Sequence, residues 1–227
     1  MITVSCVLWG SKFSLDYVYN LKRAVEENTT IPHEFVCFTD KEIPGITSII
    51  LDPGYEGWWN KLQLFNTTKL VTDRMVYLDL DTIITGNLDW LLQYDGKFMG
   101  IEDVGAVNAH QPHLKNQLQS GVMAWNYYAN SYIWNELSKN KTITTKFRGD
   151  GELLNTFIQP LGRDLLQHLY PGKLKSYKYQ VYPDKLTPET SIVCFHGKPS
   201  IIEAISKTIA TPMKTYHPQQ WIKKYWR

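Results

Sequence analysis

Residues 74–92, with the sequence RMVYLDLDTIITGNLDWLL, place two carboxylates directly after a strongly apolar run. In an extended segment, residues 76 and 78 point to one face and residues 75 and 77 to the other, and both faces are apolar. Such a strand is buried on both sides, as strands of a parallel sheet are. Open α/β folds bind ligands at the carboxyl ends of their strands. Asp79 and Asp81 are therefore expected at the ligand-binding edge of a parallel sheet.

The two acids predict a site for a divalent cation. They are separated by one residue, so their side chains converge only if the strand ends between them and the chain turns. Carboxylate oxygens favour magnesium or manganese over zinc. The alternative is that Asp81 caps the turn before Thr82 while Asp79 is an exposed strand end. The apolar lead-in favours the metal site.

The segments around this strand alternate between strand and helix patterns. Strands are expected at 2–8, 35–38, 47–51, 98–102, 119–126 and 192–195, an extended tyrosine-rich run at 174–181, and helices at 15–28, 59–65, 88–92, 150–159 and from Ala129 onward. This order predicts an α/β fold with a mostly parallel, twisted sheet flanked by helices. No internal repeat or low-complexity linker is present, so a single domain over residues 1–227 is predicted.

Composition excludes some classes of protein. With 227 residues, of which 43% are hydrophobic, the chain can bury a sizeable core. A formal charge of only +2 argues against a nucleic-acid surface. Three cysteines in apolar runs predict buried thiols in a reducing compartment. Without a basic-led signal segment or an apolar run of membrane-spanning length, a cytoplasmic location is expected.

A second candidate segment, HGKP at 196–199, follows the last predicted strand. If this strand ends near the acids, His196 reaches the same ion and Lys198 a phosphate, while Gly197 permits close backbone approach. Alone, a histidine in such a position is more often a hydrogen-bonded structural residue. Its pairing with the acids favours a ligand.

Two further segments each have a structural and a functional interpretation. Asp150 opens an apolar helical run, where it either caps the helix or presents a carboxylate to substrate. In WWNK at 58–61, the tryptophans suit core packing, and Lys61 at the start of a helix could reach an anionic ligand.

Together these segments resemble the glycosyltransferase family 8 group, which includes glycogenin and the lipopolysaccharide galactosyltransferases, and in particular its small bacterial or viral relatives. The resemblance runs from about Val4 to Pro199. It rests on six segments in family order: VLWGSKF, WWNKLQLF, VYLDLDTIITGNLDWLL, QSGVMAWN, GDGELLNTF and CFHGKP.

This resemblance implies a GT-A fold with a Rossmann-like sheet. Within the single catalytic domain, about 1–100 would bind the nucleotide sugar, about 101–200 would hold the acceptor and the catalytic groups, and 201–227 would form a basic aromatic tail. The implied reaction moves a hexose from a nucleotide sugar, most often UDP-glucose or UDP-galactose, to a glycan or glycolipid acceptor. Mn²⁺ or Mg²⁺ is the implied cofactor, and retention of anomeric configuration is implied.

The family's functional positions can be carried over residue by residue. The metal ligands fall on Asp79, Asp81 and His196, and the catalytic carboxylates on Asp150 and Asp81. The donor-binding set is expected to be Leu8, Trp9, Phe13, Lys61, Asp79, Leu80, Asp81, Gly197 and Lys198, with the base and ribose at Leu8, Trp9 and Phe13.

The chain departs from the family pattern in two places. It has H-G-K-P-S at 196–200 where the family has roughly H-x-x-G-x-x-K-P-W. It also has Gly151 where a glutamine often follows the Asp150 position. Because that glutamine has been discussed as a nucleophile in relatives, Gly151 favours front-face transfer over double displacement.

Two other classes of function stay open. D-x-D-x-T after an apolar strand also fits a haloacid dehalogenase-type phosphatase, with Asp79 as nucleophile and Asp81 as acid/base. Against this, some seventy residues precede the motif and no later acidic pair is evident. With 13% aromatic residues, a non-catalytic glycan-binding module is the other alternative.

The carboxyl end of the chain is its basic end, with six Lys or Arg against one Glu over 198–227. Its last segment, HPQQWIKKYWR at 217–227, has two interpretations. Peripheral contact with anionic lipid would suit a glycolipid acceptor. Packing of Trp221, Ile222 and Trp226 against the domain is the favoured one.

Overall fold

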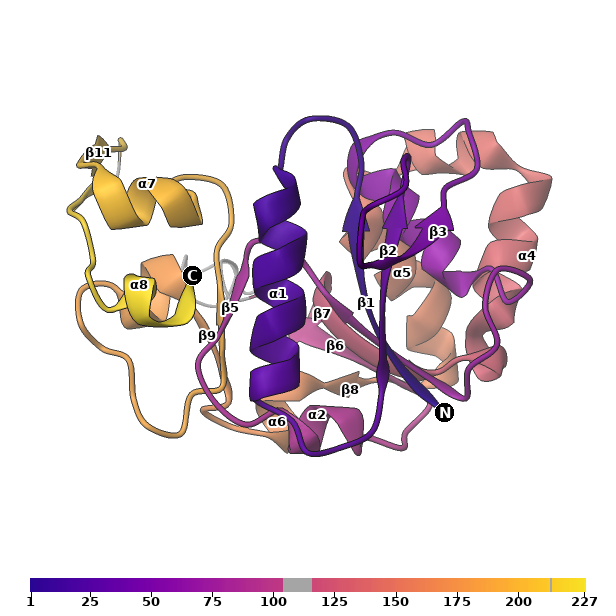
Figure 1. The fold of residues 1–227 in the computed structure, drawn as a ribbon. Coiled ribbons are helices and arrows are strands. Elements are labelled where there is room, and N and C mark those ends of the chain that lie inside the picture. Colours follow the sequence, from indigo (N-terminus) through magenta and orange to yellow (C-terminus); the bar gives the residue numbers. More distant parts are fainter. Residues whose placement is uncertain (104–115, 213) are drawn as a thin grey trace.

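The computed structural model describes residues 1–103, 116–212 and 214–227, and a seven-stranded sheet forms its centre (Figure 1). In spatial order the strands are β3 (Thr47–Ile50), β2 (Glu34–Thr39), β1 (Ile2–Leu8), β4 (Arg74–Leu78), β7 (Leu118–Asn126), β6 (Phe98–Glu102) and β8 (Asp164–Leu165). β7 is antiparallel to both neighbours, and the other adjacent pairs are parallel. The predicted mostly parallel α/β sheet is confirmed.

Helices cover both faces of this sheet. α1 (Leu15–Glu27) lies on one face, and α4 (Ser131–Lys139) and α5 (Asp150–Ile158) lie toward the other (Figure 1). The shorter α-helices are α2 (Asp89–Leu92), α6 (Leu166–Leu169), α7 (Ile201–Ser206) and α8 (Ile222–Tyr225). The 3-10 helices are η1 (Gly57–Phe65), η3 (Tyr128–Asn130), η4 (Lys141–Lys146) and η5 (Gln159–Leu161), and η6 (Tyr177–Val181) is a π-helical turn.

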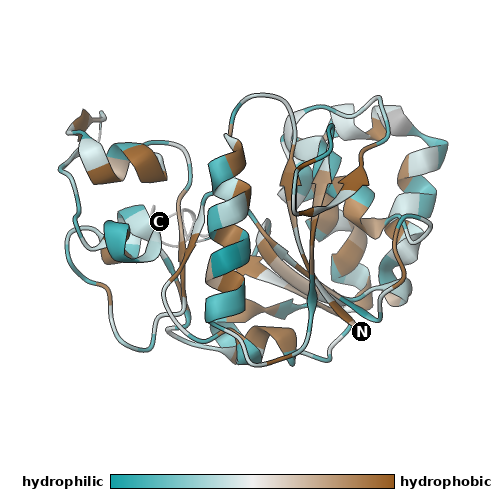
Figure 2. Cartoon of the chain, in the orientation of Figure 1, coloured by the Kyte–Doolittle hydropathy of each residue, from teal (hydrophilic) through white to brown (hydrophobic). Residues whose placement is uncertain are grey.

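β4 is buried on both of its faces, as its sequence predicts. Val76 and Leu78 belong to the core cluster that includes α1, whereas Met75 and Tyr77 belong to the cluster that includes η1, α4 and α5. Figure 2 shows the corresponding hydrophobic colour on the strands and hydrophilic colour on the outer side of α1. The strand separates two cores, and its end is fixed by packing from both sides.

A second, three-stranded sheet was not predicted, and it begins just after the acids. Its order is β5 (Thr82–Ile84), β10 (Ile192–Cys194) and β9 (Leu174–Ser176), with β5 antiparallel and β9 parallel to β10. A short hairpin of β11 (Ile209–Ala210) and β12 (Thr215–Tyr216) lies near the carboxyl end. Asp79 and Asp81 therefore lie where the chain passes from one sheet to the next.

Two predicted elements differ from the structure. The helix at 59–65 is a 3-10 helix over Gly57–Phe65, whose period of three matches the spacing of Trp59, Leu62 and Phe65. The extended run expected at 174–181 is a strand only to Ser176. The rest is the π-helical turn η6, in which Tyr177 is fully buried with its ring stacked 4.2 Å from the Phe195 ring.

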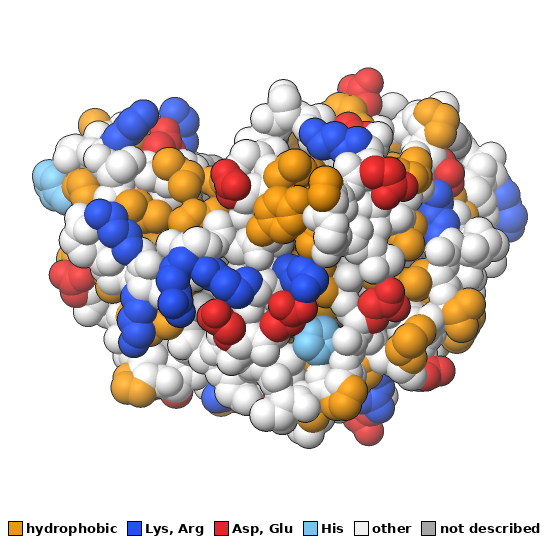
Figure 3. Space-filling model, viewed as in Figure 1, with side chains coloured by type: hydrophobic (Ala, Val, Ile, Leu, Met, Phe, Trp, Pro, Cys, Tyr) orange, Lys and Arg blue, Asp and Glu red, His pale blue; other side chains and the backbone are white. Residues whose placement is uncertain are grey.

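The carboxyl-terminal segment packs against α1. Ile222 is fully buried, and the Trp226 ring lies 4.7 Å from the Tyr17 ring. Arg227 pairs with Glu27 at 3.7 Å, and the face in Figure 3 shows acidic and basic side chains mixed around this end of the chain. The favoured packing interpretation of the tail is thus supported, while lipid contact remains a prediction.

Two further expectations from the sequence concern the cysteines and membrane-spanning segments. All three cysteines are free and buried, as expected. Across the described ranges, the helices are all too short or too polar to cross a bilayer.

Candidate functional site

A cavity of about 1080 Å³ opens at the carboxyl end of β4. It is lined by the ends of β1 and β4, η1, β7, the start of α5 and the turn after β10. Parallel α/β sheets bind ligands at this edge, where backbone groups and loop side chains converge. The acids, Lys61, Asp150 and His196 all line this one cavity.

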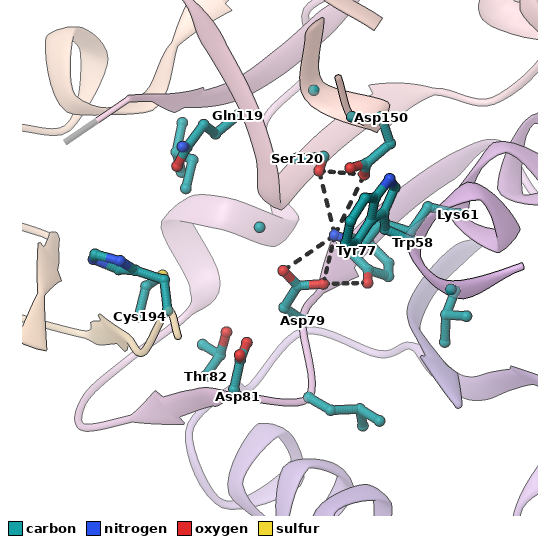
Figure 4. A pocket seen from close by; sticks show the side chains of 18 of the residues that line it. Trp58, Lys61, Tyr77, Asp79, Asp81, Thr82, Gln119, Ser120, Asp150 and Cys194 are labelled. Carbon is teal, nitrogen blue, oxygen red and sulfur yellow. Dashed lines mark hydrogen bonds and ion pairs between the residues drawn. The ribbon is translucent and has the colours of Figure 1, made fainter. Parts of the chain in front are cut away.

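Asp79 and Asp81 are held in place by the backbone on either side of them. The Asp79 N–H donates to the Gly121 carbonyl at 2.9 Å, which extends the β4 to β7 ladder by one residue. The Asp81 carbonyl accepts from the Phe195 N–H at 2.9 Å, at the start of the second sheet. Both carboxylates reach the cavity because one sheet ends and the other begins there (Figure 4).

Lys61 joins carboxylates from distant parts of the chain. Its Nζ lies 2.8 Å from Asp79 Oδ1 and 3.4 Å from Asp150 Oδ2, and it donates to Ser120 Oγ at 3.3 Å (Figure 4). Burial by itself lowers the pKa of Lys61, but the charges of Asp150 and Asp79 outweigh it and raise this pKa above its usual value. Lys61 is therefore a fixed positive charge inside the cavity.

Tyr77 provides the second contact to Asp79. Two residues apart on an extended chain, the two side chains point the same way, and the Tyr77 hydroxyl donates to Asp79 Oδ1. Burial, together with the Asp79 charge, keeps the pKa of Tyr77 well above its ordinary value. The phenol is thus a permanent hydrogen-bond donor to this carboxylate.

Asp81 is the less compensated acid. Burial and the neighbouring Asp79 charge raise the pKa of Asp81 to about 7. In the described part of the chain its carboxylate forms no salt bridge, although Lys12 and Lys61 act on it through space. A divalent cation would supply the missing positive charge, and oxygen ligands suit Mn²⁺ or Mg²⁺.

His196 lies at the same cavity, on the turn after β10. Burial, together with the Lys178 charge, lowers the pKa of His196 to about 4, so the imidazole is neutral near pH 7, as a metal ligand must be. Its Nε2 is hydrogen-bonded to Ser176 Oγ at 2.8 Å, and its ring stacks 5.5 Å from the Tyr179 ring.

The predicted metal ligands therefore fit the ion in chemistry, and they share a cavity. Within residues 1–103, 116–212 and 214–227, however, there is no group of three or more His, Cys, Asp or Glu side chains close enough together to hold a metal ion as they stand. Asp79 already contacts Lys61 and Tyr77, and His196 is already hydrogen-bonded to Ser176. Asp81 is therefore the carboxylate whose charge most needs a cation.

Asp150 is the first residue of α5, and Gly149 occupies the cap position. The carboxylate does not cap the helix. Oδ2 accepts from Ser120 Oγ and contacts Lys61, whereas Oδ1 has no partner among the described residues. The capping interpretation of Asp150 is therefore wrong, and its functional role stays a prediction.

The next residue, Gly151, lies against the backbone of β7. A Cβ at this position would be 3.2 Å from the Leu118 carbonyl oxygen and 3.4 Å from the Gln119 Cα. The close approach of α5 to β7 explains the glycine, because any side chain would push the two elements apart.

Of the three residues expected to contact the base and ribose, one lies in the core and two line the cavity. Leu8 is fully buried in the core cluster and does not line the cavity. Trp9 is 38% exposed and lines it, as does Phe13. Leu80 is both a core residue and part of the cavity wall.

Of the two donor-binding residues predicted in the turn after β10, only one lines the cavity. Gly197 lines the cavity with a φ of +65°, a left-handed conformation that favours glycine. Lys198 is outside the lining, is 73% exposed and pairs with Glu203 at 3.5 Å. Lys178 is also outside the lining, but its Nζ would lie 3.3 Å from a Cβ on Gly197.

Several residues at the site were not singled out from sequence. Ser120 on β7 and Lys12 in the segment after β1 line the cavity, and both fall inside motif segments, but single polar residues are too common to give a sequence signal. Tyr77 could have been found from its two-residue spacing to Asp79. Trp58 also lines the cavity and is 56% exposed, whereas its neighbour Trp59 packs on the core as expected.

No protein-family model and no curated protein matches the sequence. Solved structures do match. The apo form of glycosyltransferase GlyE from Streptococcus pneumoniae TIGR4 has a TM-score of 0.67 and 13% identity, with coverage of 99% of this chain and 59% of GlyE. The galactosyltransferase LgtC, solved with donor and acceptor sugar analogs, has a TM-score of 0.63 and 13% identity over 88% of each chain. The bifunctional glycosyltransferase WbbM has a TM-score of 0.61 and 10% identity over 88% of this chain and 46% of WbbM.

These similarities confirm the expected glycosyltransferase fold. This chain spans about three fifths of the length of GlyE and nearly all of the length of LgtC. At such identities the fold is what the proteins share, and function has to be argued from the site.

Proposed function

We propose that this protein is a metal-dependent glycosyltransferase that moves a hexose from a nucleotide sugar to a glycan or glycolipid acceptor. UDP-glucose and UDP-galactose are the first candidate donors. One observation carries the proposal: Asp79, Asp81, Asp150 and His196 line a single cavity at the carboxyl end of β4. The chain has this cavity in a fold that it shares with glycosyltransferases. A volume of about 1080 Å³ is ample for a nucleotide sugar.

In this proposal Asp79, Asp81 and His196 would hold Mn²⁺ or Mg²⁺ against the diphosphate. When bound, such an ion neutralises the charge that develops on the leaving diphosphate. Trp9 and Phe13 would contact the base and ribose at the end of β1, and Gly197 would bring the turn after β10 close to the diphosphate.

Lys61 and Asp150 would act on the sugar and the acceptor. Lys61 is a fixed ammonium that Asp79 and Asp150 hold in the cavity, so it adds positive charge where the leaving group departs. Asp150 Oδ2 is occupied by Ser120 and Lys61, and Oδ1 is left to accept a hydrogen bond from the acceptor hydroxyl. That contact orients the acceptor oxygen toward the sugar.

The transfer breaks the bond between sugar C1 and the diphosphate oxygen and forms one between C1 and the acceptor oxygen. The electron pair of the broken bond stays on the diphosphate, and the acceptor proton passes to that departing oxygen. Both events take place on one face of the sugar, so configuration is retained. Gly151 supports this front-face course, because glycine offers no nucleophilic side chain at that position.

The test is a panel of nucleotide sugars with and without MnCl₂, followed by thermal shift and by nucleotide release. We expect at least one UDP-hexose to stabilise the protein and to be hydrolysed slowly, in both cases only with the metal. Asp79→Asn and Asp81→Asn should lower the release rate by about 100-fold or more, because charge stabilisation worth several kcal/mol is lost. Product NMR should show the anomer of the donor.

The matched control is Asp95→Asn, an exposed carboxylate outside the cavity lining, which should leave the rate unchanged. The proposal fails if every nucleotide sugar is inert in both assays. Metal-dependent hydrolysis of aryl phosphates that needs Asp79 would identify the phosphatase alternative instead.

A further inference from the structure

Trp58 is the most exposed tryptophan of this protein, at 56%, and it faces the cavity. The other seven tryptophans are described as well, and each is less exposed. Leaving an indole in water forfeits stabilisation on the order of 2 kcal/mol compared with burial. The exposed indole is therefore available to a ligand in the cavity.

The surroundings of Trp58 leave its indole uncovered. Gly149, across the cavity wall, has an extended backbone with φ −170° and ψ 170°, a conformation open to any residue. A Cβ on Gly149 would lie 4.0 Å from Trp58 Nε1, at van der Waals contact, so a long side chain at this position can reach over the indole edge. Space beside the indole is what this glycine provides.

Trp58 also lies beside the groups that act on the acceptor. It precedes Lys61 by three residues on η1, and on a 3-10 helix that spacing places both side chains on one face. Gly149, its neighbour in space, is followed directly by Asp150. Figure 4 accordingly shows the indole next to Lys61 and Asp150, on the side of the cavity away from Asp81.

The polar groups at this end of the cavity suit an uncharged sugar ring. Arg148 and Glu152 line the cavity and pair with each other at 3.4 Å, so together they add no net charge. They still offer hydrogen-bond donors and acceptors to hydroxyl groups at the rim of a ring. The C–H face of a pyranose packs on an indole as other apolar groups do.

We propose that Trp58 is the acceptor platform, on which a neutral pyranose ring stacks with one hydroxyl directed to Asp150. This inference rests on the proposed function and names the class of its acceptor: a glycan that ends in an uncharged hexose, bound through its face. A base stacked on Trp58 is the competing occupant, and the test separates the two.

The test compares wild type with Trp58→Ala, Trp58→Phe and Gly149→Leu. Neutral methyl hexosides and disaccharides serve as acceptors with the active UDP-sugar. For Trp58→Ala we expect acceptor KM to rise about five- to tenfold with little change in kcat, since an aromatic contact is worth up to about a tenfold change. Trp58→Phe should keep part of the effect, and Gly149→Leu should mimic the loss while leaving the indole in place.

Two further measurements keep the outcome clear. Saturation-transfer NMR of the same hexosides, without donor, should show ring-proton contacts in wild type that Trp58→Ala loses. The dissociation constant of UDP for Trp58→Ala should stay within about twofold of the wild-type value. Tyr128→Ala, a 49% exposed aromatic outside the cavity, is the matched control and should change none of these values.

The inference is overturned if acceptor KM and saturation transfer are unchanged in Trp58→Ala, or if UDP affinity falls instead. Inert nucleotide sugars combined with hexoside contacts at Trp58 would refute the transferase proposal but not the sugar platform. Active transfer with an unaltered KM would refute only the platform.

Discussion

Individual side chains at the cavity compensate one another's charge. Lys61 lies between Asp79 and Asp150, and its ammonium offsets carboxylates that would otherwise repel. Removing one member of such a group leaves buried charge unpaired, which is strongly destabilising. A cation bound at Asp79 would share that carboxylate with Lys61 and Tyr77, whereas Asp81 has room for a new partner.

Thr82 lies next to Asp81, and its buried hydroxyl forms no hydrogen bond to any described residue. The thiol of its strand partner Cys194 is close enough for this hydroxyl to affect its pKa, but a thiol is a weak acceptor. Thr82→Val keeps the shape and removes the unpaired group. We therefore expect the free energy of unfolding, from urea denaturation, to stay equal or to rise by about 1 kcal/mol.

Thr85→Val is the matched control. The Thr85 hydroxyl donates to the Thr190 carbonyl at 2.8 Å, so its loss should lower the free energy of unfolding by about 1 kcal/mol. Equal losses for the two variants would mean that the Thr82 hydroxyl has a partner after all.

Short elements of the fold depend on side chains from neighbouring segments. α2 is only four residues long, too short to be stable by itself. Its first residue, Asp89, ties it to the segment after α1, where Thr29 Oγ1 donates to Oδ1 at 2.6 Å, and the Thr30 N–H and Oγ1 each donate to Asp89 at 2.8 Å. These hydrogen bonds hold the short helix in place against the segment after α1.

The same bonds predict a pH dependence for Asp89. Hydrogen bonds from Thr29 first, and then from Thr30, hold its pKa well below the usual range. A lowered folded pKa gives stability that is complete above the unfolded pKa, about 3.9, and is lost as the pH falls toward the folded value. Asp89→Asn should therefore unfold at lower urea than wild type at pH 7, and this difference should shrink below about pH 4.

Asp95→Asn serves as the control in the same titration, because Asp95 is exposed. Its urea midpoint should follow wild type at every pH. A constant gap between Asp89→Asn and wild type from pH 7 to pH 3 would contradict the assigned hydrogen bonds.

At the scale of the whole molecule, the carboxyl-terminal segment returns to the amino-terminal half. Ile222 and Trp226 join the core cluster that also contains β1 and α1, and the Arg23 guanidinium donates to the Tyr225 carbonyl at 3.5 Å. The basic tail expected from the sequence is thus partly a structural element. Lys223 and Lys224 remain exposed, where contact with lipid is still a prediction.

Ile222→Ala tests this structural contribution. Ile222 is fully buried, so we expect the free energy of unfolding to fall by about 2–4 kcal/mol in urea denaturation. Ile202→Ala removes the same atoms at a position that is 47% exposed, and it should cost less than about 0.5 kcal/mol. Similar values for the two variants would show that the tail does not pack as described.

Much of the fold could be predicted because its signals are local. The uninterrupted apolar run at 75–78 predicts a strand buried on two sides, and helical spacing predicts α1. β5 and β8 could not be predicted, since strands of three and two residues gain their stability from partners that are distant in sequence.

By itself the sequence determined an α/β sheet that ends in Asp79 and Asp81, because hydrophobic periodicity and the position of a charge after a buried strand need no tertiary information. Only the tertiary structure decided which side chains join those acids. It brought Lys61 between Asp79 and Asp150, directed Lys198 away to Glu203, and left Trp58 open beside Gly149. The direction of a side chain depends on what packs around it, and for these residues the surroundings come from segments far apart in the chain.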